Sequence, residues 1–96
     1  MNRSRAIELL AQCKPALAAR FGVTRLALFG STVRNAARSD SDIDILVAFD
    51  GPATSERYFG VQFFLEDLFD IPVDLVTEKA LRPELRPFVE KEAVHV

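Results

Sequence analysis

Three aspartates carry carboxylates at a spacing that could support metal-dependent chemistry. Asp42 and Asp44 flank one apolar residue in the segment DID, and Asp74 lies in the apolar segment PVDLV. If residues 43–49 form a strand, Asp42 and Asp44 share one face, about 6.6 Å apart at Cα, and the alternate apolar residues face the core. Their carboxylates could then converge on one cation, or on two cations about 3.5–4 Å apart.

Asp74 is a candidate third carboxylate. A charge inside an apolar strand is costly unless it is paired or bound. If the strand of Asp74 neighbours that of Asp42 and Asp44, the three carboxylates would repel each other, and a divalent cation would relieve that repulsion. With one cysteine, Cys13, and one histidine, His95, the chain favours a carboxylate-bound hard cation such as Mg²⁺ over zinc.

Ordinary structural roles remain open for each acid. Aspartates often form Asx-turns or end a strand, and Asp74 could lie at the rim of a sheet. Asp40, in the segment SDSD, is interpreted as turn chemistry. Cys13 lies in a helical pattern and is interpreted as a small buried apolar residue.

A second group, Gly30, Ser31 and Arg34, is typical of a phosphate-binding element. Glycine lets the backbone approach a ligand, a helix that follows a strand presents free N–H groups, and Ser31 adds a hydroxyl donor. Arg34 lies one turn further on and can bind a phosphate oxygen. The alternative is that Ser31 only caps a helix and Arg34 is solvated. Next to the acids, this element indicates a site for a nucleoside triphosphate with Mg²⁺.

Strands and helices alternate along the whole chain, so the predicted class is α/β, or two-layer α+β. Residues 4–21 are predicted to be helical, with Pro15 opening a second helical segment and Gly22 as the C-terminal cap. The further predicted elements are strand 23–29, a short helix about 32–36, a turn at 38–41, strand 43–49, helix 55–69, strand 73–77, a proline-interrupted helix 80–91, and a tail or short strand at 92–96.

Length and composition limit the classes of function. Ninety-six residues allow one domain, predicted over 1–96, and 49% hydrophobic with 27% charged residues is a globular composition. The net charge of −2 argues against a general nucleic-acid coat, so no DNA partner is expected. The sequence contains neither a membrane-spanning run nor a signal peptide, which predicts a cytoplasmic protein with no membrane partner.

The segment from Gly30 to Asp44, in which Gly-Ser is followed by ten residues and then DID, resembles the motif of the DNA polymerase beta-type nucleotidyltransferases. More narrowly, the chain is similar to the minimal nucleotidyltransferases (MntA-like), the MNT partners in HEPN–MNT toxin–antitoxin pairs. The resemblance covers nearly all of the chain, including the ending LRPFVEKEAVHV. One departure is Asn35, where the family commonly has glycine; asparagine also tolerates a left-handed backbone.

The resemblance implies a nucleotidyltransferase fold and a role for each motif residue. Gly30 and Ser31 would hold the triphosphate of ATP, and Arg34 would support it. Asp42 and Asp44 would bind two Mg²⁺ ions. Asp74 would complete one metal site and help to deprotonate the acceptor hydroxyl.

The reaction that the resemblance implies is transfer of AMP from ATP to a hydroxyl, notably of a tyrosine, on the cognate HEPN toxin. The chain would then act as an antitoxin. Because no acceptor domain is recognised in the sequence, the acceptor is expected on another protein, in a hetero-oligomer with the toxin, or on the chain's own oligomer. The alternatives are a non-catalytic antitoxin that neutralises its partner by occlusion, and a carboxylate metal-binding domain without transfer chemistry.

The predicted helix 55–69 carries a candidate partner surface. At about 100° per residue, one apolar stripe is expected to face the core, formed by Tyr58, Val61, Phe64, Leu65 and Leu68. Phe59 and Phe63 fall on the polar face and indicate a contact with another chain, unless the 50–54 loop or the 92–96 tail covers them. Arg82, Arg86 and Lys91 form a basic row that is interpreted as a solvated face, with a nucleotide or partner contact as the alternative.

Overall fold

The computed structural model describes residues 1–34 and 42–96. The order of elements is α1 (Arg3–Phe21), β1 (Val23–Phe29), the 3-10 turn η1 (Gly30–Thr32), β2 (Ile43–Phe49), α2 (Ser55–Phe69), β3 (Val73–Thr77), the 3-10 turn η2 (Glu78–Ala80), α3 (Arg86–Glu92) and β4 (Val94–His95). The strands form one mixed sheet in the order β3-β2-β1-β4. The α/β character expected from the sequence is confirmed.

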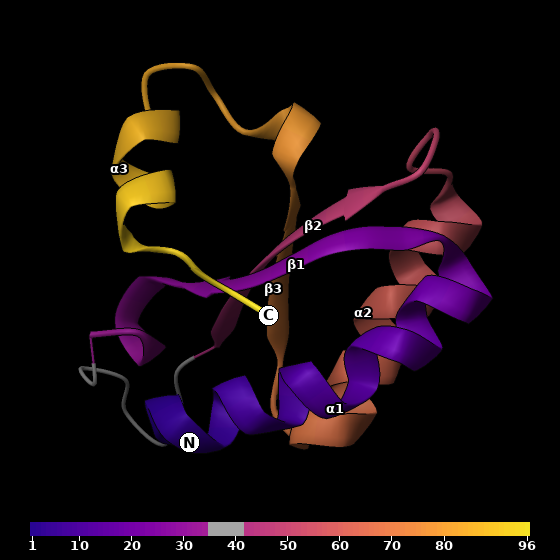
Figure 1. The fold of residues 1–96 in the computed structure, drawn as a ribbon, viewed down its shortest axis with the longest axis horizontal. Helices are drawn as coiled ribbons and strands as arrows, with labels where there is room; N and C mark the ends of the chain where they lie inside the picture. Colours follow the sequence, from indigo (N-terminus) through magenta and orange to yellow (C-terminus); the bar gives the residue numbers. More distant parts are fainter. Residues whose placement is uncertain (35–41) are drawn as a thin grey trace.

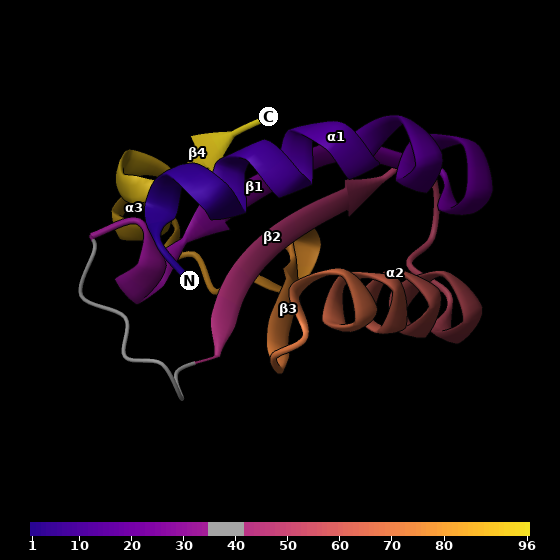
Figure 2. The same ribbon diagram turned by 90° about the horizontal axis from the view of Figure 1, so that it is seen from below.

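The core lies between the sheet and two long helices. α1 and α2 pack on one side of the sheet, and α3 lies across the sheet from α1 (Figures 1 and 2). The alternate apolar residues of β2, Ile43, Ile45 and Val47, are buried in this core, as strand alternation predicts. Asp44 therefore points to the other face of the sheet.

α1 is one continuous helix of 19 residues that contains Pro15, so the predicted joint at Lys14–Pro15 is wrong. Pro15 cannot donate a hydrogen bond to the carbonyl of Ala11. Both residues are exposed, so this loss falls on the solvent side of the helix, where water can replace the bond. The predicted cap is confirmed, because Gly22 ends α1 with a φ of 73°.

α2 matches the predicted range 55–69, with the Thr54 side chain as its N-terminal cap. Its buried stripe is Val61, Leu65 and Phe69 rather than one that includes Leu68, which is exposed. A polar row on the same helix covers the free edge of β3. Tyr58 and Gln62 donate to the carbonyls of Leu75 and Val73, and the Glu66 carboxylate accepts from the N–H of Val73 (3.0 Å). These bonds satisfy backbone groups that an edge strand leaves unpaired.

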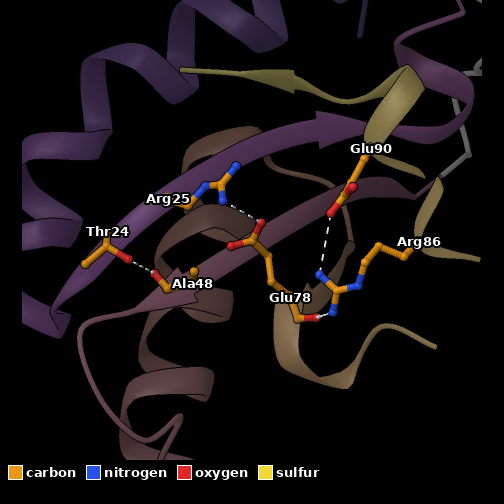
Figure 3. A network of polar contacts seen from close by, with 6 residues as sticks. All are labelled: Thr24, Arg25, Ala48, Glu78, Arg86 and Glu90. Carbon is orange, nitrogen blue, oxygen red and sulfur yellow. Dashed lines mark hydrogen bonds and ion pairs between the residues drawn. The ribbon is translucent and has the colours of Figure 1, made fainter. Parts of the chain in front are cut away.

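The C-terminal segment differs from the prediction. α3 begins at Arg86 rather than near residue 80, since η2 and a turn occupy part of the predicted helix. Arg86 Nη2 donates to the Glu78 carbonyl (2.9 Å), and the Glu78 carboxylate pairs with Arg25 of β1 (3.5 Å), as Figure 3 shows. These contacts connect η2 and the start of α3 to the sheet.

β4 confirms the short strand expected near the end of the chain. It pairs antiparallel with β1, with Val94 opposite Leu28 and His95 opposite Ala27. The predicted turn at 38–41, Asp40 and Asn35 lie outside the described residues, as does the end of the helix expected at 32–36, from residue 35 on. None of the helices in the described part of the chain combines the length and apolar character needed to cross a membrane.

Candidate active site

The parallel pairing of β2 and β3 brings two of the predicted acids together. Asp44 and Asp74 are register partners on these neighbouring strands, so their side chains leave the same face of the sheet side by side. Asp44 is half-buried, and Asp74 and Asp42 are exposed. Asp42 directly precedes β2. Of the three acids, Asp44 is thus the least accessible to water.

The electrostatics of Asp44 reflect this crowding. Its pKa is raised to about 6, first by burial, then by the charge of Asp74, a side-chain hydrogen bond with Asp74, and the charge of Asp42. Arg34 acts in the opposite direction and lowers the pKa. The strands therefore hold carboxyl groups together without enough local positive charge to balance them, which is an arrangement that a bound cation would stabilise.

Gly30 lies directly against this acidic pair. Its φ is 77°, and a Cβ atom at this position would overlap the Asp44 carboxylate. Both the backbone conformation and the close approach require glycine here. Phe29 is the register partner of Asp44 across β1 and β2, which explains why the end of β1 reaches the carboxylates. The structure thus joins the glycine–serine element and the acids, as the sequence predicted.

The candidate phosphate-binding element is a single 3-10 turn, η1, in place of the helix expected at 32–36, as far as the described residues extend. A turn of three residues provides little helix dipole, so individual donors carry any anion binding. The candidate donors are the Gly30 N–H, the hydroxyl of the half-buried Ser31 and the exposed Arg34 guanidinium.

Glu92, a residue that the sequence analysis did not single out, contacts this element. Its Oε1 atom accepts a hydrogen bond from the Gly30 N–H (2.5 Å), and its Oε2 atom accepts one from Arg34 Nη1 (2.6 Å). The side chain of Glu92 is 26% exposed. No local sequence signal could reveal this contact, because it depends on where α3 and β4 place a residue 62 positions from Gly30.

Metal binding requires a rearrangement of the acids. Within the described residues, no three acidic, histidine or cysteine side chains stand close enough together to hold a metal ion. Asp44 and Asp74 are in contact, and Asp42 is exposed at the start of β2, where its side chain can turn toward them. The donors are all carboxylates, which suits Mg²⁺.

The other predicted residues lie away from the acids. Phe59 and Phe63 on α2 are 48% and 61% exposed and stack on each other with ring centroids 6.2 Å apart. Both rings are thus open to solvent over about half of their surface or more. In the basic row, Arg86 is engaged with Glu78 and Glu90, whereas Arg82 and Lys91 are exposed. Cys13 is buried, as predicted, and burial raises the pKa of its thiol.

A pocket of about 130 Å³ lies at the C-terminal ends of β2 and β3, whereas Asp44 and Asp74 lie near the N-terminal ends of these strands. The pocket is lined by Val47, Ala48, Phe49, Gly51, Ala53, Thr77, Glu78 and Lys79. None of the candidate site residues borders it. The candidate active site is therefore the sheet face that carries Asp44 and Asp74 and not this pocket, because the acid with the raised pKa and its contact with Gly30 both lie at that face.

Comparison with known proteins agrees with this geometry. The nucleotidyltransferase domain family matches residues 10–96. The protein adenylyltransferase MntA of Thermococcus cleftensis is 38% identical over 88 residues, which is 92% of this chain and 89% of the relative. A solved structure assigned provisionally as a minimal nucleotidyltransferase is 37% identical, with a TM-score of 0.82 over 98% of this chain and 95% of that one.

Two toxin–antitoxin structures share the fold at lower identity. A toxin–antitoxin complex with AMP-PNP has a TM-score of 0.70 and 24% identity, over 99% of this chain and 72% of that one. A tri-AMPylated HEPN toxin with its MNT antitoxin from Shewanella oneidensis has a TM-score of 0.60 and 23% identity, over 98% of this chain and 67% of that one. From the family match and the identity to MntA, the chain belongs to the nucleotidyltransferase domain family, as an MntA-like minimal nucleotidyltransferase enzyme.

Proposed function

We propose that this nucleotidyltransferase transfers AMP from ATP, with Mg²⁺, to a hydroxyl group of a cognate HEPN toxin in the cytoplasm, and so acts as an antitoxin. A tyrosine is the proposed acceptor. The observation that carries the proposal is the pairing of Asp44 with Asp74 directly against Gly30. In this arrangement, a pair of carboxylates lies next to Gly30, the residue whose N–H is expected to bind the triphosphate.

The carboxylates are the proposed ligands of two Mg²⁺ ions. Asp42 and Asp44 would bind the two ions, and Asp74 would complete one of the two sites. The raised pKa of Asp44 supports this assignment, since its crowded carboxylate lacks sufficient positive charge nearby. When bound, such ions stabilise the negative charge that develops on the attacking and leaving oxygens.

The triphosphate would be held by the Gly30 N–H, the Ser31 hydroxyl and the Arg34 guanidinium. Glycine at position 30 lets the backbone donor approach a phosphate closely. Arg34 is 57% exposed, so its guanidinium has room to move toward a ligand. Its charge already acts on Asp44, which places it near the carboxylates as well.

The proposed reaction is an in-line displacement at the alpha-phosphorus of ATP. The acceptor oxygen forms a bond to that phosphorus while the bond to the bridging oxygen breaks, and pyrophosphate leaves with the electron pair. The proton of the acceptor hydroxyl would pass to the carboxylate of Asp74. Because Asp74 is exposed, a hydroxyl on another protein can reach it.

The partner assignment is supported by the relatives. The Shewanella oneidensis MNT antitoxin is described in complex with a tri-AMPylated HEPN toxin, which is the product that this reaction would give. On the present chain, Phe59 and Phe63 form an exposed aromatic pair that we assign to the toxin interface. Exposed aromatic residues of this kind are enriched where protein surfaces meet.

The alternative is an antitoxin that works by occlusion alone. Both mechanisms are tested by incubating the chain with Mg-ATP and the HEPN protein encoded beside it, and following the intact mass of that protein. The proposed function predicts one or more AMP adducts with the wild-type chain and none with the variant Asp42→Ala/Asp44→Ala. If the double variant neutralised the toxin as well as wild type did, occlusion would be the mechanism.

A further inference from the structure

Glu92 occupies the donors that the proposed function assigns to phosphate. Its two carboxylate oxygens accept separately from the Gly30 N–H (2.5 Å) and from Arg34 Nη1 (2.6 Å). A carboxylate and a phosphate are both anions that bind guanidinium and backbone N–H groups in this way. An ATP phosphate that contacted the same two donors would meet the negative charge of Glu92.

The elements around Glu92 hold it in this position. At the start of α3, Arg86 donates to the Glu78 carbonyl, and Glu78 in turn pairs with Arg25 of β1 (Figure 3). At the other end of α3, the Ala93 N–H closes the helix on the Val89 carbonyl (2.8 Å). Two residues beyond Glu92, Val94 pairs with Leu28, which is two residues before Gly30. Contacts on both sides of Glu92 thus place its carboxylate beside the turn.

We propose that Glu92 is an intramolecular anion that competes with the triphosphate for Gly30 and Arg34, and so sets the affinity of the chain for its nucleotide. The proposal rests on the proposed function, because it takes these two donors as the phosphate anchor. Nucleotide binding then requires the Glu92 side chain to leave Gly30 and Arg34. The helix backbone can remain in place, because a side-chain rotation separates the carboxylate from both donors.

A different role for Glu92 makes the opposite prediction. If Glu92 only oriented Arg34 toward the ligand, removing its charge would leave the guanidinium without a fixed position and would weaken binding. Competition predicts tighter binding after the same change. The direction of the change in affinity therefore separates the two roles.

The test compares Glu92→Gln with Glu90→Gln. Glutamine at position 92 keeps an oxygen that can accept from the Gly30 N–H but removes the negative charge. Glu90 lies on the same helix, is exposed and contacts Arg86 rather than the turn, so its variant makes the same change in net charge away from the anchor. Titration calorimetry with inorganic tripolyphosphate, and separately with Mg-ATP, would give the dissociation constants at one fixed ionic strength.

We expect Glu92→Gln to lower both dissociation constants by about three- to tenfold. The variant no longer forms the partly exposed ion pair with Arg34, and position 92 no longer repels the negatively charged ligand. Glu90→Gln should change them less than about twofold. In an Arg34→Ala background, the gain from Glu92→Gln should shrink, because one of the two contested donors is gone. An unchanged or raised dissociation constant for Glu92→Gln, relative to Glu90→Gln, would overturn the proposal.

A measurement on the wild-type chain gives an independent answer if the variant does not fold. Titration with tripolyphosphate should shift the NMR signals of the Gly30 amide, the Arg34 guanidinium and the Glu92 side-chain carboxyl carbon together. A shift of the first two without the third would overturn competition by Glu92. If no form of the chain bound tripolyphosphate or Mg-ATP, the anchor itself would be wrong; binding without AMP transfer would refute the proposed function alone.

Discussion

Asp44 and Asp74 are register partners in neighbouring parallel strands, so their carboxyl groups lie side by side on one face of the sheet. The contact is set by backbone pairing and not by flexible loops, so the two acids are held together before any ligand arrives. Preorganised groups of this kind lower the reorganisation that catalysis requires. The same contact makes the ligand-free chain less stable where both acids are charged.

Asp44→Asn should stabilise the ligand-free chain at neutral pH. The folded pKa of about 6 lies above the usual 3.8, so the folded chain binds an extra proton between these values. Its free energy of unfolding therefore falls as pH rises through this window. Allowing for partial exposure, the variant should gain about 1–2 kcal/mol at pH 7.5 and about nothing at pH 4. Urea denaturation at both pH values would measure this.

The control for that experiment is Asp67→Asn, which makes the same change in charge at an exposed position of α2. It should leave the free energy of unfolding nearly unchanged at both pH values. Equal stabilisation by the two variants at pH 7.5 would mean that net charge, and not the crowding of Asp44, is responsible.

Gly30→Ala should abolish AMP transfer and destabilise the fold by about 1–2 kcal/mol, because alanine is strained at a φ of 77° and its Cβ would overlap the Asp44 carboxylate. Gly22→Ala is the matched control. Gly22 has a φ of 73°, but a Cβ there would meet the exposed Asp50 side chain, far from the site. Thermal melts should show that both variants lose stability. If Gly30→Ala transferred AMP as fast as Gly22→Ala, the close contact at Gly30 would have no role.

Glu66→Ala should loosen the edge of β3 beside Asp74. The Glu66 carboxylate accepts from the Val73 N–H, and its loss leaves that donor to water, at an expected cost of about 1 kcal/mol. Hydrogen exchange at Val73 should become faster, and AMP transfer should slow, since Val73 precedes Asp74 in the chain. Asp67→Ala, on an exposed position of the same helix, should change neither rate. Unaltered exchange at Val73 would show that the bond does not protect this edge.

Phe59→Ser/Phe63→Ser should weaken binding to the HEPN partner without unfolding the chain. Both rings are only partly buried within the chain, so the change in unfolding free energy should stay below about 2 kcal/mol. Light scattering of the mixture with the toxin would measure assembly. Phe88→Ser removes another exposed ring, 74% accessible, from α3 and should leave assembly intact. Assembly by the double variant equal to that of wild type would refute this interface.

Local patterns in the sequence predicted most of the fold. The alternation around Asp44, the glycine cap at Gly22 and the range of α2 all follow from short-range rules, and the structure confirms them. The predicted break at Pro15 was wrong because the solvent side of a helix tolerates a lost hydrogen bond. Leu68 was misplaced because the helix turns its buried stripe toward Phe69.

The sequence predicted that Asp44 and Asp74 lie close together only if their two strands are neighbours in the sheet, and it could not establish that the strands are neighbours. The contact of Glu92 with Gly30 and Arg34 was not predictable, because it depends on how α3 and β4 return to the sheet from a distant part of the chain. A glutamate near the end of a helix usually faces solvent, so its residue type alone carries no such signal.

The central claim is tested most directly by the rate of AMP transfer to the cognate HEPN toxin with Asp74→Asn and Asp67→Asn. Single-turnover reactions with Mg-ATP, followed by intact mass, would give the rate for each variant. The account predicts that Asp74→Asn slows transfer by about 10²–10⁴-fold, as for the loss of a general base, and that Asp67→Asn transfers AMP at the wild-type rate. Transfer by Asp74→Asn as fast as by Asp67→Asn would contradict the account.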